Sequence, residues 1–349
     1  MDIKTLSDIC NYRKETLPSN KCDRMTFIST ENMLPNKAGV VISAKCPTYG
    51  NVSKYYPGDV LVSNIRPYFK KIYLADKEGT CSNDVLVFFP KREVCTSDFL
   101  FCLLSTDAFF AHATKTAKGT KMPRGDRSAI MGYQINWVPI NEQSGISEPI
   151  LNVYRKIKLN EKINDNLLKL WETRTRKLLD SAATTPTLIG EICRPKQWKT
   201  LTKSELTAGA PIDVYGAGGV IGQTREPNHN ERVIGVVCRG AGCGTLMVID
   251  PPSYVTGNVM CLDNITNQVG LPCLYAILKD RGLSDIVSGS AQPQITGSSI
   301  KNTYINLPNY EVCNRITKEG GQTFDMININ KRENEHLTRI RDLLLSKLF

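Results

Sequence analysis

Two long segments of the chain repeat apolar residues at intervals of three and four. In the first segment these residues are Ile150, Val153, Ile157, Leu167, Trp171 and Leu178, and in the second they are Ile327, Leu337, Leu344 and Leu348. This spacing places apolar side chains along one face of an α-helix. Residues 157–178 and 327–348 also contain neither proline nor glycine. The pattern therefore predicts that each half of the chain ends in a long amphipathic helix.

The two helical segments are similar in sequence as well as in pattern. When residues 157–178 are aligned with 327–348, six of 22 positions are identical: Ile157, Asn160, Asn164, Leu167, Lys177 and Leu178 match Ile327, Asn330, Asn334, Leu337, Lys347 and Leu348. We expect the isoleucines and leucines of the two helices to face each other in an antiparallel coiled coil. Buried asparagines on that face would fix the register of pairing. The alternative is that the asparagines are exposed to solvent.

Shorter repeats precede the helices in the same order. Residues 6–10 (LSDIC) recur as 189–193 (IGEIC), 99–104 (FLFCLL) as 273–278 (CLYAIL), and 119–123 (GTKMP) as 289–293 (GSAQP). A conserved order of matches is typical of a duplicated domain. The two halves are therefore predicted to share one fold.

Between these repeats the pattern is typical of short strands separated by turn residues. Such strands are predicted at residues 60–64, 71–74, 84–89, 233–237 and 244–249. The predicted fold is α+β: two β-rich domains, each followed by a long helix, with the helices pairing as an antiparallel coiled coil of pseudo-two-fold symmetry. The expected boundaries are 1–142 and 185–318 for the β-rich domains and 143–184 and 319–349 for the helices.

Composition narrows the class of protein. The 44 Lys and Arg residues exceed the 34 Asp and Glu residues, and the net charge of +10 favours a polyanionic partner. The sequence contains no apolar run of the roughly 18 residues that span a bilayer, so we expect no membrane association. Twelve cysteines occur without a CxxC pair, which indicates a reducing, cytoplasmic compartment. The only three histidines are widely separated in sequence, so few ligands are available for a metal site, and no metal site is predicted.

Enzyme motifs are weak in this chain. Residues 215–222 (YGAGGVIG) resemble a dinucleotide-binding loop, but the third glycine is displaced and no helix can follow, so a turn is favoured. Residues 250–254 (DPPSY) are similarly better explained as a proline turn between strands. The sequence has no P-loop and no carboxylate cluster. We therefore predict no catalytic and no cofactor-binding residues.

Basic residues concentrate in one segment of the first half. Five cations occur within 13 residues and are interrupted by Gly119, Pro123 and Gly125: Lys115, Lys118, Lys121, Arg124 and Arg127. A flexible basic strip of this kind suits phosphate contacts. Further candidate DNA-binding residues are Arg66, Lys70 and Lys71, which flank two aromatic residues, and Arg225, Arg239, Gln292 and Gln294 in the second half. For any single one of these residues, a position on a solvated basic surface is a simpler explanation than a contact with DNA.

Several of these segments together resemble a known family. Residues 57–68, 81–87, 214–222, 239–244 and 289–295, with the leucine-rich helices after each copy, resemble the specificity (S) subunit of type I restriction-modification systems. The resemblance covers essentially the whole chain. It implies two target-recognition domains that each read one half of an asymmetric, bipartite site in double-stranded DNA, and two helices that form a spacer.

The same resemblance implies a non-catalytic subunit of a larger complex. Its partners would be methyltransferase (M) subunits, two in number, and restriction (R) subunits. S-adenosylmethionine, ATP and Mg would bind to those partners, and no cofactor would bind to this chain. Two alternatives remain: a DNA methyltransferase or nuclease with its own activity, and a basic structural or RNA-binding protein.

Overall fold

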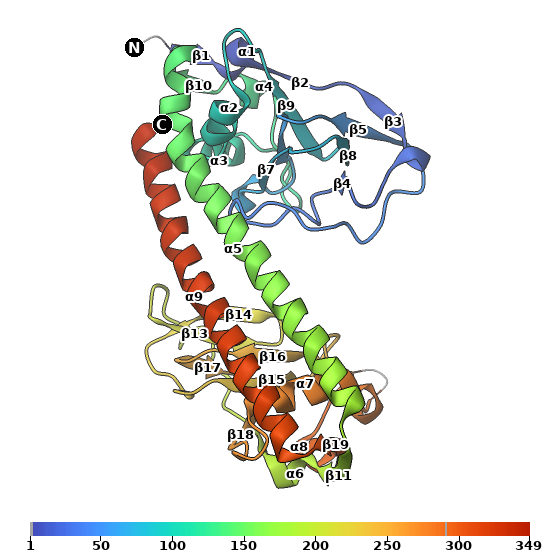
Figure 1. Ribbon diagram of the computed structural model, residues 1–349. Coiled ribbons are helices and arrows are strands. Elements are labelled where there is room, and N and C mark those ends of the chain that lie inside the picture. Colours follow the sequence, from blue (N-terminus) through green and yellow to red (C-terminus); the bar gives the residue numbers. More distant parts are fainter. Residues whose placement is uncertain (1–2, 290–291) are drawn as a thin grey trace. The chain divides into compact units, whose positions relative to one another are not determined.

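The computed structural model describes residues 3–289 and 292–349 and divides into two compact units (Figure 1). Unit 1 comprises Met1–Leu159 with Glu333–Phe349, and unit 2 comprises Asn160–Arg332. Each unit contains a β-rich body and part of both long helices, α5 (Ile140–Ser181) and α9 (Tyr310–Leu348). The predicted α+β class, with two β-rich regions and two long helices that pack together, is confirmed.

Unit 1 is built on two four-stranded sheets. The first has the order β2 (Cys10–Tyr12), β9 (Val85–Pro90), β6 (Val60–Ser63), β7 (Ile72–Leu74), and all its pairs are antiparallel. The second has the order β3 (Thr16–Pro18), β5 (Asn51–Tyr55), β8 (Gly79–Cys81), β4 (Phe27–Ile28). The three strands predicted from the sequence of this half are β6, β7 and β9.

Short helices cover the first sheet of unit 1. They are α1 (Leu6–Ile9), α2 (Ser97–Leu104), α3 (Asp107–Lys115) and α4 (Arg127–Met131). The 3-10 turns η1 (Ser19–Lys21) and η2 (Pro67–Phe69) lie between β3 and β4 and between β6 and β7, and β1 (Ile3–Thr5) pairs with β10 (Gln134–Asn136). Threonine hydroxyls cap α2 and α3 by accepting the amide hydrogens of Phe99 and Phe109. All six residues from Phe99 to Leu104 are buried. Ile150 of α5 and Leu345 of α9 complete this core, which fixes both helices to the body of unit 1.

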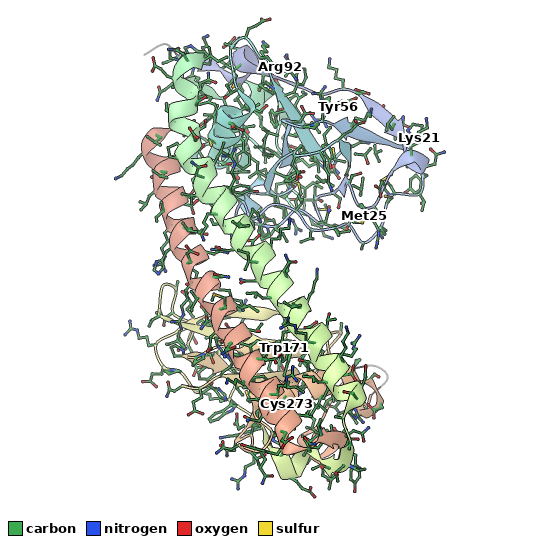
Figure 2. All side chains as sticks on the ribbon, in the orientation of Figure 1. Lys21, Met25, Tyr56, Arg92, Trp171 and Cys273 are labelled. Atoms are coloured by element: carbon green, nitrogen blue, oxygen red, sulfur yellow. The ribbon has the colours of Figure 1, made fainter. Side chains whose placement is uncertain are left out.

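Unit 2 repeats this order of elements with fewer strands. Its first sheet has the order β12 (Arg194–Gln197), β18 (Val259–Asp263), β15 (Val233–Val237), β16 (Leu246–Ile249). Its second sheet has the order β14 (Gly219–Thr224), β13 (Ile212–Gly216), β17 (Ser253–Val255). Its remaining elements are α6 (Ile189–Ile192), α7 (Leu271–Arg281), η3 (Ser284–Ile286), α8 (Gly297–Lys301) and the pair β11 (Thr184–Leu188) and β19 (Tyr304–Pro308). Trp171 and Cys273, labelled in Figure 2, both belong to its core.

The two suspected enzyme motifs form turns, as predicted. Residues 215–222 lie in the β13–β14 hairpin, where Gly219 has φ of +97°. Such a backbone conformation favours glycine. Residues 251–252 form the proline turn between β16 and β17. Neither segment precedes a helix, so neither builds the anion site that a dinucleotide needs.

Helix α9 begins at Tyr310, nine residues before the boundary expected at 319. Two adjacent glycines, Gly320 and Gly321, lie inside this helix. Gly320 is required by packing: a Cβ atom there would lie 2.5 Å from the Cβ of Pro272 and 2.8 Å from the Trp171 ring. The glycine therefore permits close contact between helices instead of ending one.

Candidate DNA interface

The segment between α3 and α4 of unit 1 forms a closed loop, which we call the basic loop (residues 115–127). Lys118 and Arg124 exchange two backbone hydrogen bonds of 2.8 and 2.9 Å. The loop is attached to the end of β6 because Arg66 donates its amide hydrogen to the Pro123 carbonyl at 2.8 Å and Gly125 donates to the Asn64 carbonyl at 3.0 Å. The backbone of the basic loop is thus held in place, while its side chains point outward.

All five cations of the basic loop are exposed, but their partners differ. Lys118 lies 2.5 Å from Asp126, and Arg124 lies 3.1 Å from Asp84. Asp126 also caps α4 through the amides of Ser128 and Ala129, and its pKa is lowered by Lys118 and by these bonds. No ion pair to Lys115, Lys121 or Arg127 is found in the part of the chain that the structure describes. The loop therefore retains a net positive charge.

The second group of predicted contacts, around η2, is only partly available to a ligand. Arg66 lies beside the basic loop and donates to the Lys121 carbonyl at 3.4 Å. Lys70 lies 2.9 Å from Asp107. The Lys71 ammonium donates to the Thr30 carbonyl at 2.6 Å, and burial lowers its pKa. Thus Arg66 extends the basic surface, whereas Lys71 points into the protein.

Unit 2 has a loop in the corresponding place with different chemistry. Ser288 and Gln294 exchange backbone hydrogen bonds of 2.9 and 2.8 Å, and Gly240 donates to the Pro293 carbonyl at 3.1 Å. Arg239, Gln292 and Gln294 are exposed at this position, and Ser290 and Ala291 lie outside the described residues. Arg225 follows β14, on the other sheet of unit 2, and is not part of this group. The structure therefore brings Arg239 together with the two glutamines.

The long helices pack against each other in an antiparallel manner within each unit. In unit 2, Asn330 donates its side-chain amide to Asn164 Oδ1 at 2.7 Å, and the Trp171 and Phe324 rings are 5.1 Å apart. In unit 1, Asn334 donates to the Ile157 carbonyl at 3.4 Å. Asn160 and Ile157 are buried, while the other predicted pairing residues are half-buried: Asn164, Leu167, Leu178, Ile327, Asn330, Asn334 and Leu337. Leu348 is exposed, and Leu345 packs into the core in its place.

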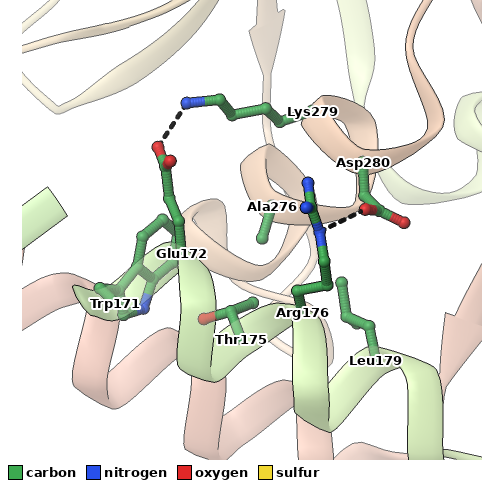
Figure 3. A pocket seen from close by; sticks show the side chains of 8 residues that line it. All are labelled: Trp171, Glu172, Thr175, Arg176, Leu179, Ala276, Lys279 and Asp280. Carbon is green, nitrogen blue, oxygen red and sulfur yellow. Dashed lines mark hydrogen bonds and ion pairs between the residues drawn. The ribbon is translucent and has the colours of Figure 1, made fainter. Parts of the chain in front are cut away.

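A small pocket in unit 2 lies where α5 meets α7 (Figure 3). Its walls carry charges of both signs, but these are paired: Glu172 contacts Lys279, and Arg176 lies 3.2 Å from Asp280. Trp171 also lines the pocket. The pocket is therefore part of the packing between α5 and α7, and its charged groups are paired with one another.

We expect Trp171→Ala to lower the free energy of unfolding by about 3 to 5 kcal/mol, because a buried ring is replaced by a cavity. The Trp171 side chain is 3% exposed and contacts both Tyr275 and Phe324. The neighbouring Leu170→Ala is the matched control, since Leu170 is 53% exposed. Denaturant unfolding measures both variants. Equal destabilisation by the two would contradict this packing.

Sequence reasoning missed a buried lysine that joins the body of unit 1 to α9, next to a residue that contacts α5. The Lys37 ammonium lies 3.0 Å from Asp107 of α3 and 3.0 Å from Asp342 of α9. The adjacent Ala38 carbonyl accepts a hydrogen bond from Lys158 of α5 at 2.5 Å. Burial raises the pKa of Asp107, but Lys70 and Lys37 lower it more. No sequence pattern marks Lys37, because its partners are distant in the chain.

Replacing Lys37 by methionine should destabilise the protein by about 1 to 3 kcal/mol at neutral pH, since both carboxylates lose a charged donor. The effect should shrink in acid. A carboxyl group with a lowered pKa contributes stability above its ordinary value, here 3.8, and loses it as the pH falls below that value. Urea unfolding at pH 7 and pH 3 measures this difference. Lys77→Met, at an exposed position, should have little effect at either pH.

Comparison with known proteins agrees with these observations. The model of the type I restriction modification DNA specificity domain matches residues 1–169 and 186–339. This chain therefore belongs to the type I restriction-modification DNA specificity family, as its sequence indicated.

Individual relatives are distant. The chain is 26% identical over 129 residues to the specificity subunit of the type I restriction enzyme EcoDI of Escherichia coli, a match covering 37% of this chain and 28% of that protein. It is 25% identical over 226 residues to a type I specificity subunit of Mycoplasma genitalium, covering 60% of this chain and 57% of that one. The matches thus span less than two thirds of the length of these relatives.

Among solved structures, the S subunit of a type I system from M. genitalium has a similar fold. The TM-score is 0.65 at 18% identity, covering 100% of this chain and 96% of that chain. Within residues 3–289 and 292–349, no helix is long and apolar enough to cross a bilayer.

Proposed function

We propose that this chain is the DNA sequence-specificity subunit of a type I restriction-modification complex and recognises an asymmetric, bipartite site in double-stranded DNA. Residues 1–142 and 185–318 act as two target-recognition domains. Residues 143–184 and 319–349 act as the helical spacer between them. The observation that carries this proposal is the matched pair of loops, which share one backbone arrangement but present different side chains.

The matched loops support two different half-sites. In unit 1, Arg66 and the cations of the basic loop suit phosphate contacts and, for arginine, the edge of guanine. In unit 2, Arg239 lies beside Gln292 and Gln294, whose amides suit adenine. Arg225, on a separate sheet, would contact the DNA backbone on its own. Lys70 and Lys71 would contribute little, because both are engaged within the protein.

A second apolar face on the helices supports docking of partner subunits. In unit 2, Met326 and Ile329 are exposed at a spacing of three residues, and Ile340 and Leu343 repeat this arrangement in unit 1. Exposed apolar stripes of this kind favour association with another helix. We assign these stripes to methyltransferase subunits, two per chain, which in turn would recruit restriction subunits. S-adenosylmethionine, ATP and Mg would belong to those partners.

A methyl-transfer assay separates this function from its main alternative. The purified chain is incubated with labelled S-adenosylmethionine and DNA, with and without its methyltransferase partner. We expect no turnover by the chain alone and site-specific adenine methylation by the complex. Turnover by the chain alone would instead identify a methyltransferase in its own right. Equal binding to structured RNA and to target DNA would favour a general RNA-binding role.

A further inference from the structure

Three potential metal ligands meet in unit 2, where no metal site was predicted from the sequence. Cys261 and Asp263 are two residues apart on β18, so their side chains point to the same face. His229 precedes β15 and is held beside them because its backbone exchanges two hydrogen bonds of 3.0 Å with Ser253 of β17. The ligand atoms of His229, Cys261 and Asp263 all lie within 4.8 Å of one another.

The hydrogen bonds around His229 determine which of its nitrogen atoms carries a proton. The Asn228 amide donates to the Val255 carbonyl at 3.0 Å, and its Oδ1 accepts the Val255 amide hydrogen at 2.9 Å. These two bonds orient the amide, so the atom 2.6 Å from His229 Nδ1 is an oxygen. An oxygen there accepts, and Nδ1 must donate.

The other nitrogen of His229 then faces a second acceptor. In a neutral imidazole with a proton on Nδ1, Nε2 carries a lone pair. Nε2 lies 3.1 Å from Asp263 Oδ1. Two lone pairs at this distance repel each other unless a cation lies between them. That cation is either a second proton on the imidazole or a metal ion.

The third ligand and the surroundings favour the metal ion. A sulfur, a nitrogen and a carboxylate oxygen form a donor set that suits Zn²⁺. A zinc-bound histidine is commonly oriented by a hydrogen-bond acceptor that receives the proton of its other ring nitrogen. Asn228 Oδ1 is such an outer acceptor for His229 Nδ1. A cavity of about 650 Å³, lined among others by Trp198, Asn228, His229, Asp263 and Asn264, opens beside the cluster. Solvent in this cavity can supply a fourth ligand.

We propose that His229 Nε2, Cys261 Sγ and Asp263 Oδ1 form a zinc site whose fourth ligand is water. Zn²⁺ replaces the thiol proton of Cys261 and the second proton of the His229 imidazole, and both leave through the cavity to solvent, so two protons are released for each ion bound. The charges of the thiolate and the carboxylate balance that of the ion. The site joins the loop before β15 to the end of β18. This inference is independent of the proposed function.

Zinc affinity should decrease as the pH falls. Binding of metal to a thiol releases a proton and is therefore pH-dependent.

Cobalt titration of the full chain, stripped of metal with a chelator, tests the site. We expect one Co²⁺ per chain, with a thiolate-to-cobalt charge-transfer band in the near ultraviolet and visible bands typical of four-coordinate cobalt. Added Zn²⁺ should displace the bound Co²⁺ and abolish the charge-transfer band and the visible bands. Cys261→Ala should remove the charge-transfer band. Cys102→Ala, a buried cysteine of unit 1, should leave it unchanged.

Two further variants keep the test decisive if Cys261→Ala folds poorly. His229→Gln should weaken Co²⁺ binding at least tenfold, and Asn228→Ala, which removes only the outer acceptor, should weaken it by about 10- to 100-fold. The proposal is overturned if the full chain gives no charge-transfer band. It is also overturned if the band persists in folded Cys261→Ala or at unchanged affinity in His229→Gln. Either result would mean that a proton, and not a metal ion, lies between His229 and Asp263.

Discussion

Removal of residues 159–165 from α5 together with residues 329–335 from α9 is expected to shorten the unread gap of the DNA target by about 10 Å, or about three base pairs. Seven helical residues span about this length, and a seven-residue deletion keeps the packed faces in register. The pairing of Asn164 with Asn330 shows that these two stretches lie opposite each other. The sequences of both half-sites should be unchanged.

The same double deletion should also weaken binding. Three base pairs correspond to about 100° of rotation around the DNA axis, so the two half-sites no longer face the protein in the same way. Methylation mapping of the variant in complex with its partners measures the gap. Deletion of residues 159–165 alone is the control, and it should disrupt helix pairing without giving a defined new gap. An active double-deletion protein with an unaltered gap would rule out the spacer role.

Reversal of charge at Lys115, Lys118 and Lys121 should weaken DNA binding about 100-fold near physiological salt, to a similar degree for all sequences. Contacts to phosphates carry no sequence information, so half-site preference should be retained. Lys115 and Lys121 should contribute most, because Lys118 is already paired with Asp126. The dependence of affinity on salt should flatten by up to ~0.9 for each lost contact.

A second triple variant controls for net charge. Lys14, Lys21 and Lys77 are exposed in unit 1 outside the basic loop, and their replacement by glutamate changes the total charge equally. Salt titrations of both triples, followed by fluorescence anisotropy with labelled DNA, should show a flatter slope only for the basic loop. An unchanged slope for the Lys115, Lys118 and Lys121 variant would show that the basic loop faces away from DNA.

The regular parts of this fold could be predicted because their patterns are local. Apolar spacing along residues 150–178 predicted α5, and β-branched runs predicted β6, β9 and β15. Comparison of the two halves also placed residues 119–123 and 289–293 in corresponding loops. Both loops do follow the same backbone arrangement in the structure.

Features that depend on distant residues could not be predicted in this way. Gly320 lies inside α9 because Trp171 and Pro272 leave no room for a side chain, and neither neighbour is near it in sequence. Lys71 belongs to a basic cluster in the sequence, yet its ammonium points into the protein because it donates a hydrogen bond to the Thr30 carbonyl. His229 and Asp263 are 34 positions apart but lie within hydrogen-bonding distance. The bases read by each loop likewise depend on side-chain reach and loop shape.

Methylome sequencing of cells that express this chain with its partner subunits tests the central claim most directly. Two proteins are compared: the natural chain and a chimera in which residues 188–310 are exchanged for the matching region of a relative. We predict an asymmetric bipartite motif for the natural chain and a change in only one of its half-sites for the chimera. A single uninterrupted motif, or a change in both half-sites of the chimera, would contradict recognition by two separate domains.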